Sequence, residues 1–255
     1  MSAALQLIPL LPFPLVQPGD DLPGMICAAL RDNGLQLEAG DVLLLAQKIV
    51  SKAENRYVRL ADVEPGPEAL ALAERAEKDP RQVELILRES REVLRVRPGV
   101  IIVEHRLGYV HANAGIDKSN IPLAEDDPQV LLLPENPDAS AAALRHHVQQ
   151  EFDVPVAVII NDSAGRAWRH GTIGFAIGCS GIEPVSNQIG DPDLYGRALE
   201  VTEVAVADEL AAAASLVMGQ ADEACPLVLA RGMSWTTSTG GSASLLRDPA
   251  LDMFR

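Results

Sequence analysis

The chain has 255 residues, of which 36 are acidic and 21 are basic, giving a formal net charge of −15 at pH 7. This length is sufficient for one large domain or two modest ones. The negative charge argues against non-specific nucleic-acid binding, which needs a basic surface, but it leaves room for a local basic pocket.

The cysteines and the apolar segments restrict the class of protein further. The three cysteines, Cys27, Cys179 and Cys225, lie far apart and form no Cys-x-x-Cys pair or Cys/His cluster. We therefore expect no disulfide framework or structural zinc site, and a reducing, cytoplasmic location. The N-terminal segment lacks a basic region, so we do not expect a signal peptide. No apolar stretch reaches the roughly 18 residues of a membrane span.

The first part of the chain alternates apolar runs with turn residues. Asp20 or Asp21 is in position to cap a helix, and the pattern of a later helical region breaks near Asp79-Pro80. Leu107-Gly108 marks the turn of a hairpin. The predicted elements are strands over 4–10, 41–50 and 99–104, a helix over about 22–33, and helical structure over 67–97.

The second part begins with a connection over 122–139 that is rich in proline and acids. An alanine-rich helix is apolar on most faces, so we expect it in the core or in a subunit interface. The predicted elements are helices over 140–151 and about 195–218, and strands over 154–160, 172–182 (one interrupted strand or two) and 226–231.

These elements predict an α+β fold with mixed or antiparallel sheets and packed helices. Residues 1–235 are expected to form one unit, with two intertwined subdomains of undetermined boundaries. The stretch W-T-T-S-T-G-G-S-A-S contains few apolar residues, and residues 236–255 are expected to be a flexible tail.

Oxygen-bearing side chains follow apolar runs at three places. Asp117 and Asn120 lie in A-N-A-G-I-D-K-S-N, Asp162 and Ser163 follow A-V-I-I-N, and Gln220 follows the alanine-rich helix. Magnesium and manganese select carboxylate, amide and hydroxyl oxygens, so these residues are candidate ligands. The alternative is that the Asp and Asn residues form turns by bonding their own backbone.

Two lysines are candidates for phosphate binding. Lys48 and Lys52 are four residues apart, and they converge on one phosphate if the segment becomes helical there. The alternative is the solvated end of a strand. The sequence has no Walker phosphate loop and no Gly-x-Gly-x-x-Gly motif, so neither nucleotide-binding class is supported.

Basic side chains follow the predicted strand over 154–160. Arg166 and Arg169 are suited to hold a carboxylate or phosphate by two-point contacts, and the alternative is an ion pair with Asp162. His170 is a candidate general base, although a single histidine more often has a structural role. The segment G-C-S-G-I does not match the nucleophile-elbow pattern, which excludes a catalytic serine there.

Five segments in order resemble one family, the coenzyme F420-0:L-glutamate (γ-glutamyl) ligases of deazaflavin biosynthesis. The resemblance covers about residues 5–233. The segments are F-P-L-V-Q-P-G-D-D-L, G-D-V-L-L-L-A-Q-K-I-V-S-K-A-E, A-N-A-G-I-D-K-S-N, N-D-S-A-G-R-A-W-R-H-G-T-I-G-F-A-I-G-C-S-G-I and D-L-Y-G-R-A-L-E-V-T-E-V-A-V-A-D-E-L-A, the last running on to L-V-M-G-Q-A-D-E.

The resemblance implies GTP-dependent amide ligation. The γ-phosphate of GTP would activate the carboxylate of a lactyl-phospho-deazaflavin, and the amine of L-glutamate would then displace phosphate. Further glutamates would follow through γ-linkages. The resemblance also implies a homodimer, two divalent metal ions (Mn²⁺ or Mg²⁺), and a monovalent cation such as K⁺ as a further candidate.

The resemblance assigns roles residue by residue. Asp117 and Asp162 would share the first metal ion, and Ser163 and Gln220 would hold the second. Arg166 and Arg169 are the candidate catalytic residues, and we infer from their charge, rather than from the resemblance, that they hold anionic substrate groups. The nucleotide contacts would come from Pro12, Phe13, Pro14, Leu15, Gln47, Lys48, Lys52, Asn120, Met218, Gly219, Gln220, Ala221, Asp222, Glu223, Ala224 and Cys225.

Some positions depart from the family's pattern. Ser163 stands where threonine is frequent and retains the hydroxyl, whereas Gln220 stands where some members have glutamate and carries one negative charge less. Ala167 and Asn55 replace a frequent proline and glycine. Two other functions fit the same motifs: a guanine-nucleotide-binding regulatory module, or an amide ligase acting on a different phospho-cofactor.

Overall fold

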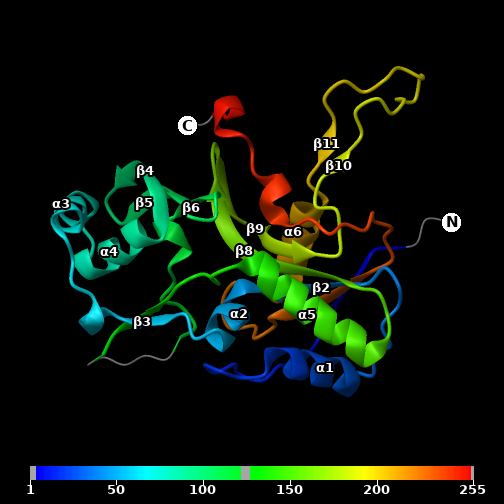
Figure 1. Ribbon diagram of the computed structural model, residues 1–255, viewed down its shortest axis with the longest axis horizontal. Coiled ribbons are helices and arrows are strands. Elements are labelled where there is room, and N and C mark those ends of the chain that lie inside the picture. Colours follow the sequence, from blue (N-terminus) through cyan, green and yellow to red (C-terminus); the bar gives the residue numbers. More distant parts are fainter. Residues whose placement is uncertain (1–3, 122–126, 254–255) are drawn as a thin grey trace.

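The computed structural model describes residues 4–121 and 127–253. In this part of the chain, five strands form the main sheet in the order β1-β12-β2-β8-β9 (Figure 1). β2 and β8 run parallel, and the other neighbouring pairs run antiparallel. The strands of this sheet are β1 (Gln6–Pro9), β2 (Val42–Ala46), β8 (Ala157–Arg166), β9 (Arg169–Ser180) and β12 (Leu227–Arg231).

Helices cover both faces of this sheet. β2 reads V-L-L-L-A and is buried on both sides, as expected for a central strand between two helical layers. Its Leu43 and Leu45 face the cluster that contains α1, α2 and α5, whereas Leu44 faces α6. These helices are α1 (Leu22–Asp32), α2 (Gln47–Ala53), α5 (Pro137–Phe152) and α6 (Val206–Met218).

Residues 57–132, here called the insert, form a smaller unit between α2 and α5. The insert has its own apolar core, which includes Leu72, Ile86 and Ile101. Figure 1 shows it beside the main sheet, with α3, α4 and the three-stranded sheet together at one end of the molecule. Its elements are β3 (Tyr57–Arg59), α3 (Pro67–Ala76), α4 (Pro80–Arg88), β4 (Ser90–Arg97), β5 (Val100–His105), β6 (Val110–Ala112) and β7 (Gln129–Leu131).

β8 continues beyond its parallel neighbour. The last residue of β2, Ala46, pairs with Asn161, and the chain then enters α2 at Gln47. From Asp162 onward β8 pairs with β9, and the two strands meet in a tight turn at Trp168. Ligands of sheets with parallel strands bind beyond the carboxyl ends of those strands, and here that edge lies between β2 and β8.

Much of the predicted fold is confirmed. The α+β class, the strand over 4–10, the hairpin turning at Leu107-Gly108 and the final strand all appear. Asp21 caps α1, since its carboxylate accepts a hydrogen bond from the N–H of Gly24 at 3.2 Å. The break in the helical region at Asp79-Pro80 separates α3 from α4.

Several predicted bounds are wrong, and one of them is the end of the strand over 154–160, which continues as β8 to Arg166. The strand over 41–50 ends at Ala46, because the chain turns into α2 once it has passed the buried layer. Residues 90–97 are β4 rather than helix, because they pair with β5 across an irregular register that places Val93 opposite Val103 and Val96 opposite Ile101. The helix over 195–218 begins at Val206.

Residues 186–204 form an arm instead of the first turns of that helix. The strands β10 (Ser186–Asn187) and β11 (Glu203–Val204) form its base, and Figure 1 shows the arm projecting from the main sheet. Leu194, Tyr195 and Val201 are exposed along it. Asp193 accepts the backbone N–H groups of Tyr195 and Arg197, which favours a turn over a helix.

The connection over 122–139 is also more ordered than predicted. It contains β7, which pairs with β3, and the first residues of α5, which begins at Pro137. Residues 122–126 lie outside the described residues. In the tail, the N–H of Ser242 donates to Asp138 Oδ1 at 2.9 Å. Among the described residues, no helix is long and apolar enough to cross a membrane.

Candidate functional site

A cavity of about 560 Å³ lies at the carboxyl ends of β2 and β8, between the main sheet and the insert. Its volume is in the range of small-molecule sites. Of the residues that the sequence analysis nominated, those that line it are Phe13, Pro14, Leu15, Gln47, Lys48, Lys52, Asp117, Asn120, Asp162, Ser163 and the run from Met218 to Cys225. Residues more than 200 positions apart in the chain thus converge on one hollow.

The two lysines lie on one side of α2, because that segment is helical and they are four residues apart. The Nζ of Lys48 donates to Ser119 Oγ at 2.8 Å, and the Nζ of Lys52 donates to the Asn120 carbonyl at 2.7 Å. Burial, followed by the charge of Lys48, lowers the pKa of Lys52. The segment is helical, as the prediction required, and the two amines reach the neighbouring residues Ser119 and Asn120; their convergence on one phosphate stays a prediction.

Asp117 enters the cavity from the insert. Its backbone bonds that of Leu131 in an isolated bridge, at 3.0 and 2.9 Å. Its Oδ1 accepts the N–H of Ser119 at 2.7 Å, and its Oδ2 lies 2.6 Å from Lys48 Nζ. Burial would raise the pKa of Asp117, but the bonds from Lys48 and Ser119 outweigh it and the net shift is downward. Asp117 is therefore an ionised ligand candidate at neutral pH.

Asp162 enters from the main sheet, at the first position of β8 beyond β2. Its Oδ1 accepts the N–H of Ser163 at 2.8 Å, and its Oδ2 lies 3.1 Å from Nε2 of His111. Nδ1 of His111 lies 2.9 Å from the carbonyl oxygen of Ala112. Burial would lower the pKa of His111, but the contact with Asp162 outweighs it and raises the pKa.

The sequence analysis missed His111. It stands in β6, in the segment Y-V-H-A-N-A-G, and is only 8% exposed. A polar residue within an apolar strand, six positions before Asp117, was the available signal. The pairing with Asp162, which is 51 residues away, was not readable because it depends on how the insert docks against β8.

Each of the two carboxylates contacts a basic side chain that comes from the other part of the molecule. Lys48, from the helix that follows β2, holds Asp117 of the insert, whereas His111, from the insert, holds Asp162 of the main sheet. In each carboxylate, one oxygen accepts a hydrogen bond from a backbone N–H and the other contacts a basic side chain. Because a carboxylate has about four acceptor positions, each retains capacity for a further ligand.

The loop after α6 closes another side of the cavity. The side chain of Asn120 donates to the Ala221 carbonyl at 2.9 Å, and Glu223 accepts the N–H of Ala221 at 2.7 Å. Gly219 has φ of 72°, and a Cβ there would lie 2.1 Å from the Glu223 carboxyl carbon. A side chain at position 219 would therefore displace the Glu223 carboxylate, and the positive φ favours glycine there.

Asn161 forms part of the inner wall and is 4% exposed. Its amide donates to Ser215 Oγ at 3.1 Å, and its Oδ1 is buried with no hydrogen-bond partner in the part of the chain that the structure describes. Gly174 allows this packing, because a Cβ there would lie 2.0 Å from Ser215 Oγ and 2.8 Å from Asn161 Oδ1. The close approach of α6 to β9 thus depends on a glycine in the strand.

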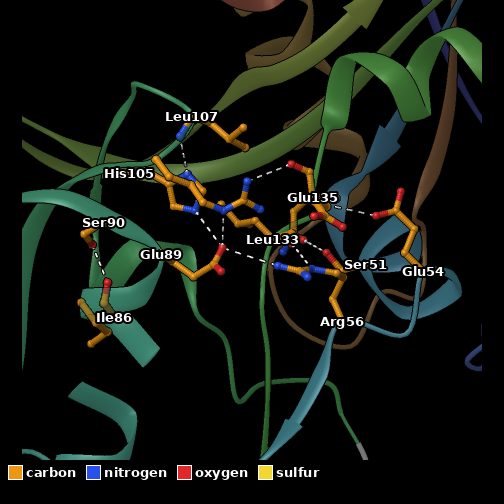
Figure 2. A network of polar contacts seen from close by, with 12 residues as sticks. Ser51, Glu54, Arg56, Ile86, Glu89, Ser90, His105, Leu107, Leu133 and Glu135 are labelled. Carbon is orange, nitrogen blue, oxygen red and sulfur yellow. Dashed lines mark hydrogen bonds and ion pairs between the residues drawn. The ribbon is translucent and has the colours of Figure 1, made fainter. Parts of the chain in front are cut away.

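A polar network holds the insert against its connecting segments (Figure 2). Glu89, at the end of α4, accepts from Arg106 Nε at 2.9 Å and lies 3.5 Å from Arg56 Nη2. Burial would raise the pKa of Glu89, but hydrogen bonds from His105 and Arg106, with the charge of Arg56, lower it to about 2. The two arginines also donate to the carbonyls of Leu133 and Glu135.

Three nominated side chains lie elsewhere. Arg166, Arg169 and His170 are exposed at the β8–β9 turn and do not line the cavity. These residues lie in a β-hairpin formed by β8 and β9, not in a loop that follows the end of a strand at Ile160. The alternative of an ion pair with Asp162 is wrong: Asp162 pairs with His111, and neither arginine pairs with an acid among the described residues. Pro12 precedes the lining residues and does not line the cavity.

The donor set suits hard divalent ions. Asp117, Asp162, Ser163 and Gln220 present carboxylate, hydroxyl and amide oxygens, which are the ligands that Mg²⁺ and Mn²⁺ prefer. Within residues 4–121 and 127–253, no group of three or more His, Cys, Asp or Glu side chains forms a metal site. Ions held by these residues would therefore need oxygens from a bound ligand or water to complete their shells.

Comparisons with known proteins agree on one family. A family model described as F420-0:Gamma-glutamyl ligase matches residues 11–232. The Coenzyme F420:L-glutamate ligase of Methanothermobacter thermautotrophicus is 50% identical over 244 residues, covering 95% of both chains. Its namesakes in Methanopyrus kandleri and Methanocaldococcus jannaschii are 47% and 41% identical, covering 96% and 86% of each chain. The chain belongs to the F420-0:γ-glutamyl ligase family.

Proposed function

We propose that this protein is a GTP-dependent ligase that joins the carboxylate of a phospho-lactyl-type deazaflavin to the amine of L-glutamate and then adds γ-linked glutamates. The observation that supports it most is the convergence of the nominated residues on one cavity, in a chain 50% identical to a named coenzyme F420:L-glutamate ligase over 95% of its length. A chance set of turn-forming residues would not meet in this way.

In the proposed reaction, the deazaflavin carboxylate attacks the γ-phosphorus of GTP, and GDP leaves. The acyl phosphate that forms is attacked by the glutamate amine, so an amide bond forms, phosphate leaves and the amine loses a proton. Both steps bring anions together, and that repulsion must be offset by fixed positive charge.

The cavity residues have separate tasks in this scheme. Lys48 and Lys52 hold phosphate oxygens as point charges. Asn120 and the run from Met218 to Cys225 hold the rest of the nucleotide, together with Phe13 to Leu15, which also line the cavity. Asp117, Asp162, Ser163 and Gln220 hold the divalent ions. When bound, these ions supply charge that offsets the repulsion between phosphate and carboxylate.

The β8–β9 turn lies beyond the residues that line the cavity, and in this scheme the second substrate reaches from the cavity to the turn. Arg166 lies four strand residues beyond Asp162, or about 13 Å at the rise of a β-strand. The run from Ser163 to Phe175 contains two arginines and a histidine but no acid. Arg166 and Arg169 hold anionic groups of the deazaflavin substrate in this scheme.

The proposal includes a homodimer. The exposed apolar side chains on the arm, Ile189, Leu194, Tyr195 and Val201, offer contact area for a second copy. The alanine-rich helix, by contrast, buries Ala207, Leu210, Ala211 and Ala214 in the chain's own core.

The first experiment measures phosphate release from GTP with Mn²⁺ or Mg²⁺, with and without the deazaflavin precursor and L-glutamate, and checks product masses. We expect phosphate release that requires both substrates, with a mass gain of one or more glutamyl units. GTP binding without substrate-dependent release would contradict the ligase and favour a regulatory nucleotide-binding module. Release with another phospho-cofactor carboxylate would change the assigned substrate.

A further inference from the structure

We propose that His111 is a positioning residue that aims the carboxylate of Asp162 at the divalent ion in the cavity. This inference rests on the proposed function, and it assigns a role to a residue that none of the motifs quoted above nominates. It starts from a contact between the insert and the main sheet, with 3.1 Å between His111 Nε2 and Asp162 Oδ2.

The ring of His111 has little freedom. It is 8% exposed, and Nδ1 lies 2.9 Å from the carbonyl oxygen of Ala112, the next residue in β6. The ring of Phe175 packs against it, with centroids 5.7 Å apart and planes at 44°. Phe175 pairs directly with Asp162 in the β8–β9 register, so the same strand pair supports both partners of the contact.

Asp162 has two fixed contacts and spare acceptor capacity. The N–H of Ser163 occupies one position on Oδ1, and His111 occupies one on Oδ2. With both oxygens held, the plane of the carboxylate is set and the remaining lone pairs are free for an ion. Groups that orient metal ligands in this way typically change metal affinity by about 10–100-fold when they are removed.

The contact between His111 and Asp162 also links the position of the insert to the orientation of a ligand on the main sheet. Asp117 and His111 both belong to the insert, and Asp162 belongs to the main sheet. A shift of the insert would therefore move Asp117, one candidate metal ligand, together with His111, the residue that orients the other ligand. Asp117 is held by Lys48 of α2, whose side chain is long and flexible. Asp162 is held by the imidazole of His111, which is buried and therefore more restricted in position.

The test uses the full chain and Mn²⁺ as the probe, with free ion followed by electron paramagnetic resonance. Three variants are compared: His111→Phe, which keeps the ring volume and removes both nitrogens; His111→Gln, which retains a donor; and His146→Phe, a control on the exposed face of α5. We expect His111→Phe to weaken Mn²⁺ binding by about 10–100-fold, His111→Gln to recover most of it, and the control to match the parent.

Two further measurements separate positioning from a structural role. In the ligase assay, we expect His111→Phe to raise the metal concentration that gives half-maximal rate, with kcat at saturating metal nearly unchanged. Thermal unfolding reports on the fold. Unchanged or tighter Mn²⁺ binding in a folded His111→Phe variant would overturn the inference, as would equal losses in the Phe and Gln variants.

Failure of the inference and failure of the proposed function are distinguishable. If the parent ligates with Mn²⁺ and His111→Phe changes neither Mn²⁺ affinity nor the metal dependence of the rate, the positioning role falls and the ligase stands. If the parent neither binds Mn²⁺ nor ligates, the proposed function falls, and the inference falls with it.

Discussion

The main sheet and the insert each deliver one carboxylate to the cavity, but they support it differently. Asp162 follows a strand whose two faces are packed by helices, and its side chain is 13% exposed. Asp117 lies on a short bridge in the insert, and its side chain is 30% exposed. The site thus has two halves: a rigid sheet half, which carries Asp162, and an insert half, which carries Asp117 and whose placement depends on polar contacts.

This difference has a physical origin. The sheet is held by apolar burial, which is non-directional and distributed over many side chains. The insert has its own core, and the bonds that tie it to its connecting segments, around Glu89, are charged and directional. Loss of one partner in such a network leaves a half-buried charge without compensation, so a single substitution there has a large effect.

The largest expected effect is on the sheet half. Asp162→Asn preserves the shape but removes the charge and replaces one acceptor oxygen with an amide donor, and we expect turnover to fall about 100-fold or more, as for other groups that stabilise charge in a transition state. Asp117→Asn should lower turnover less, because Asp117 is the more exposed of the two. Steady-state ligation and circular dichroism measure this.

The matched control is Asp32→Asn at the exposed end of α1, which should leave turnover unchanged. Full activity in a folded Asp162→Asn variant would remove Asp162 from the site. A greater loss for Asp117→Asn than for Asp162→Asn would reverse the comparison between the two halves.

The second prediction addresses the insert half. Glu89→Gln should lower the free energy of unfolding at pH 7 by about 1.5–3 kcal/mol, the range for hydrogen bonds to charged groups. The pKa of Glu89 is about 2 in the fold, against 4.5 ordinarily, so its stabilising contribution is fully present above pH 4.5 and is lost as the pH falls toward 2. The difference between parent and variant should shrink over that window.

Urea unfolding at several pH values measures this difference, with Glu92→Gln on the exposed face of β4 as the control. We also expect a higher KM for GTP in Glu89→Gln, because the insert carries Asp117 and Asn120 into the cavity. A pH-independent difference would mean that Glu89 acts through packing rather than charge. An unchanged KM would mean that the insert is held without the network.

The sequence predicted which segments form strands and helices better than it predicted where those segments end. It also predicted the residues that line the cavity better than the residues that hold them in place, such as His111. The apolar runs that become β2 and β12 were readable because a buried strand has a continuous pattern. Ser90–Arg97 was misread because its charged residues also fit a helix face, and pairing with β5 decided the outcome. Tertiary pairing of this kind is absent from a local pattern.

The residues of the cavity were nominated largely through the family resemblance, and their geometry was accessible only in part. Lys48 and Lys52 were expected to converge if their segment became helical, which it does. His111 was missed because its partner is 51 positions away in another part of the fold. The strand before Arg166 was expected to end at Ile160, whereas β8 runs on to Arg166 and both arginines lie at an exposed turn; their role toward the substrate stays a prediction.

The smallest expected effect concerns that extension of the sheet half. Arg166 and Arg169 are exposed, so each contact with an anionic substrate group is screened and contributes at most about 1 kcal/mol. We expect Arg166→Gln and Arg169→Gln each to raise the KM for the deazaflavin substrate up to about fivefold, while the KM for GTP and the unfolding free energy stay unchanged. Arg97→Gln on β4 is the exposed control. If either substitution raises the KM for GTP instead, the turn reaches the nucleotide, and the rigid half of the site extends farther around the cavity than its lining residues indicate.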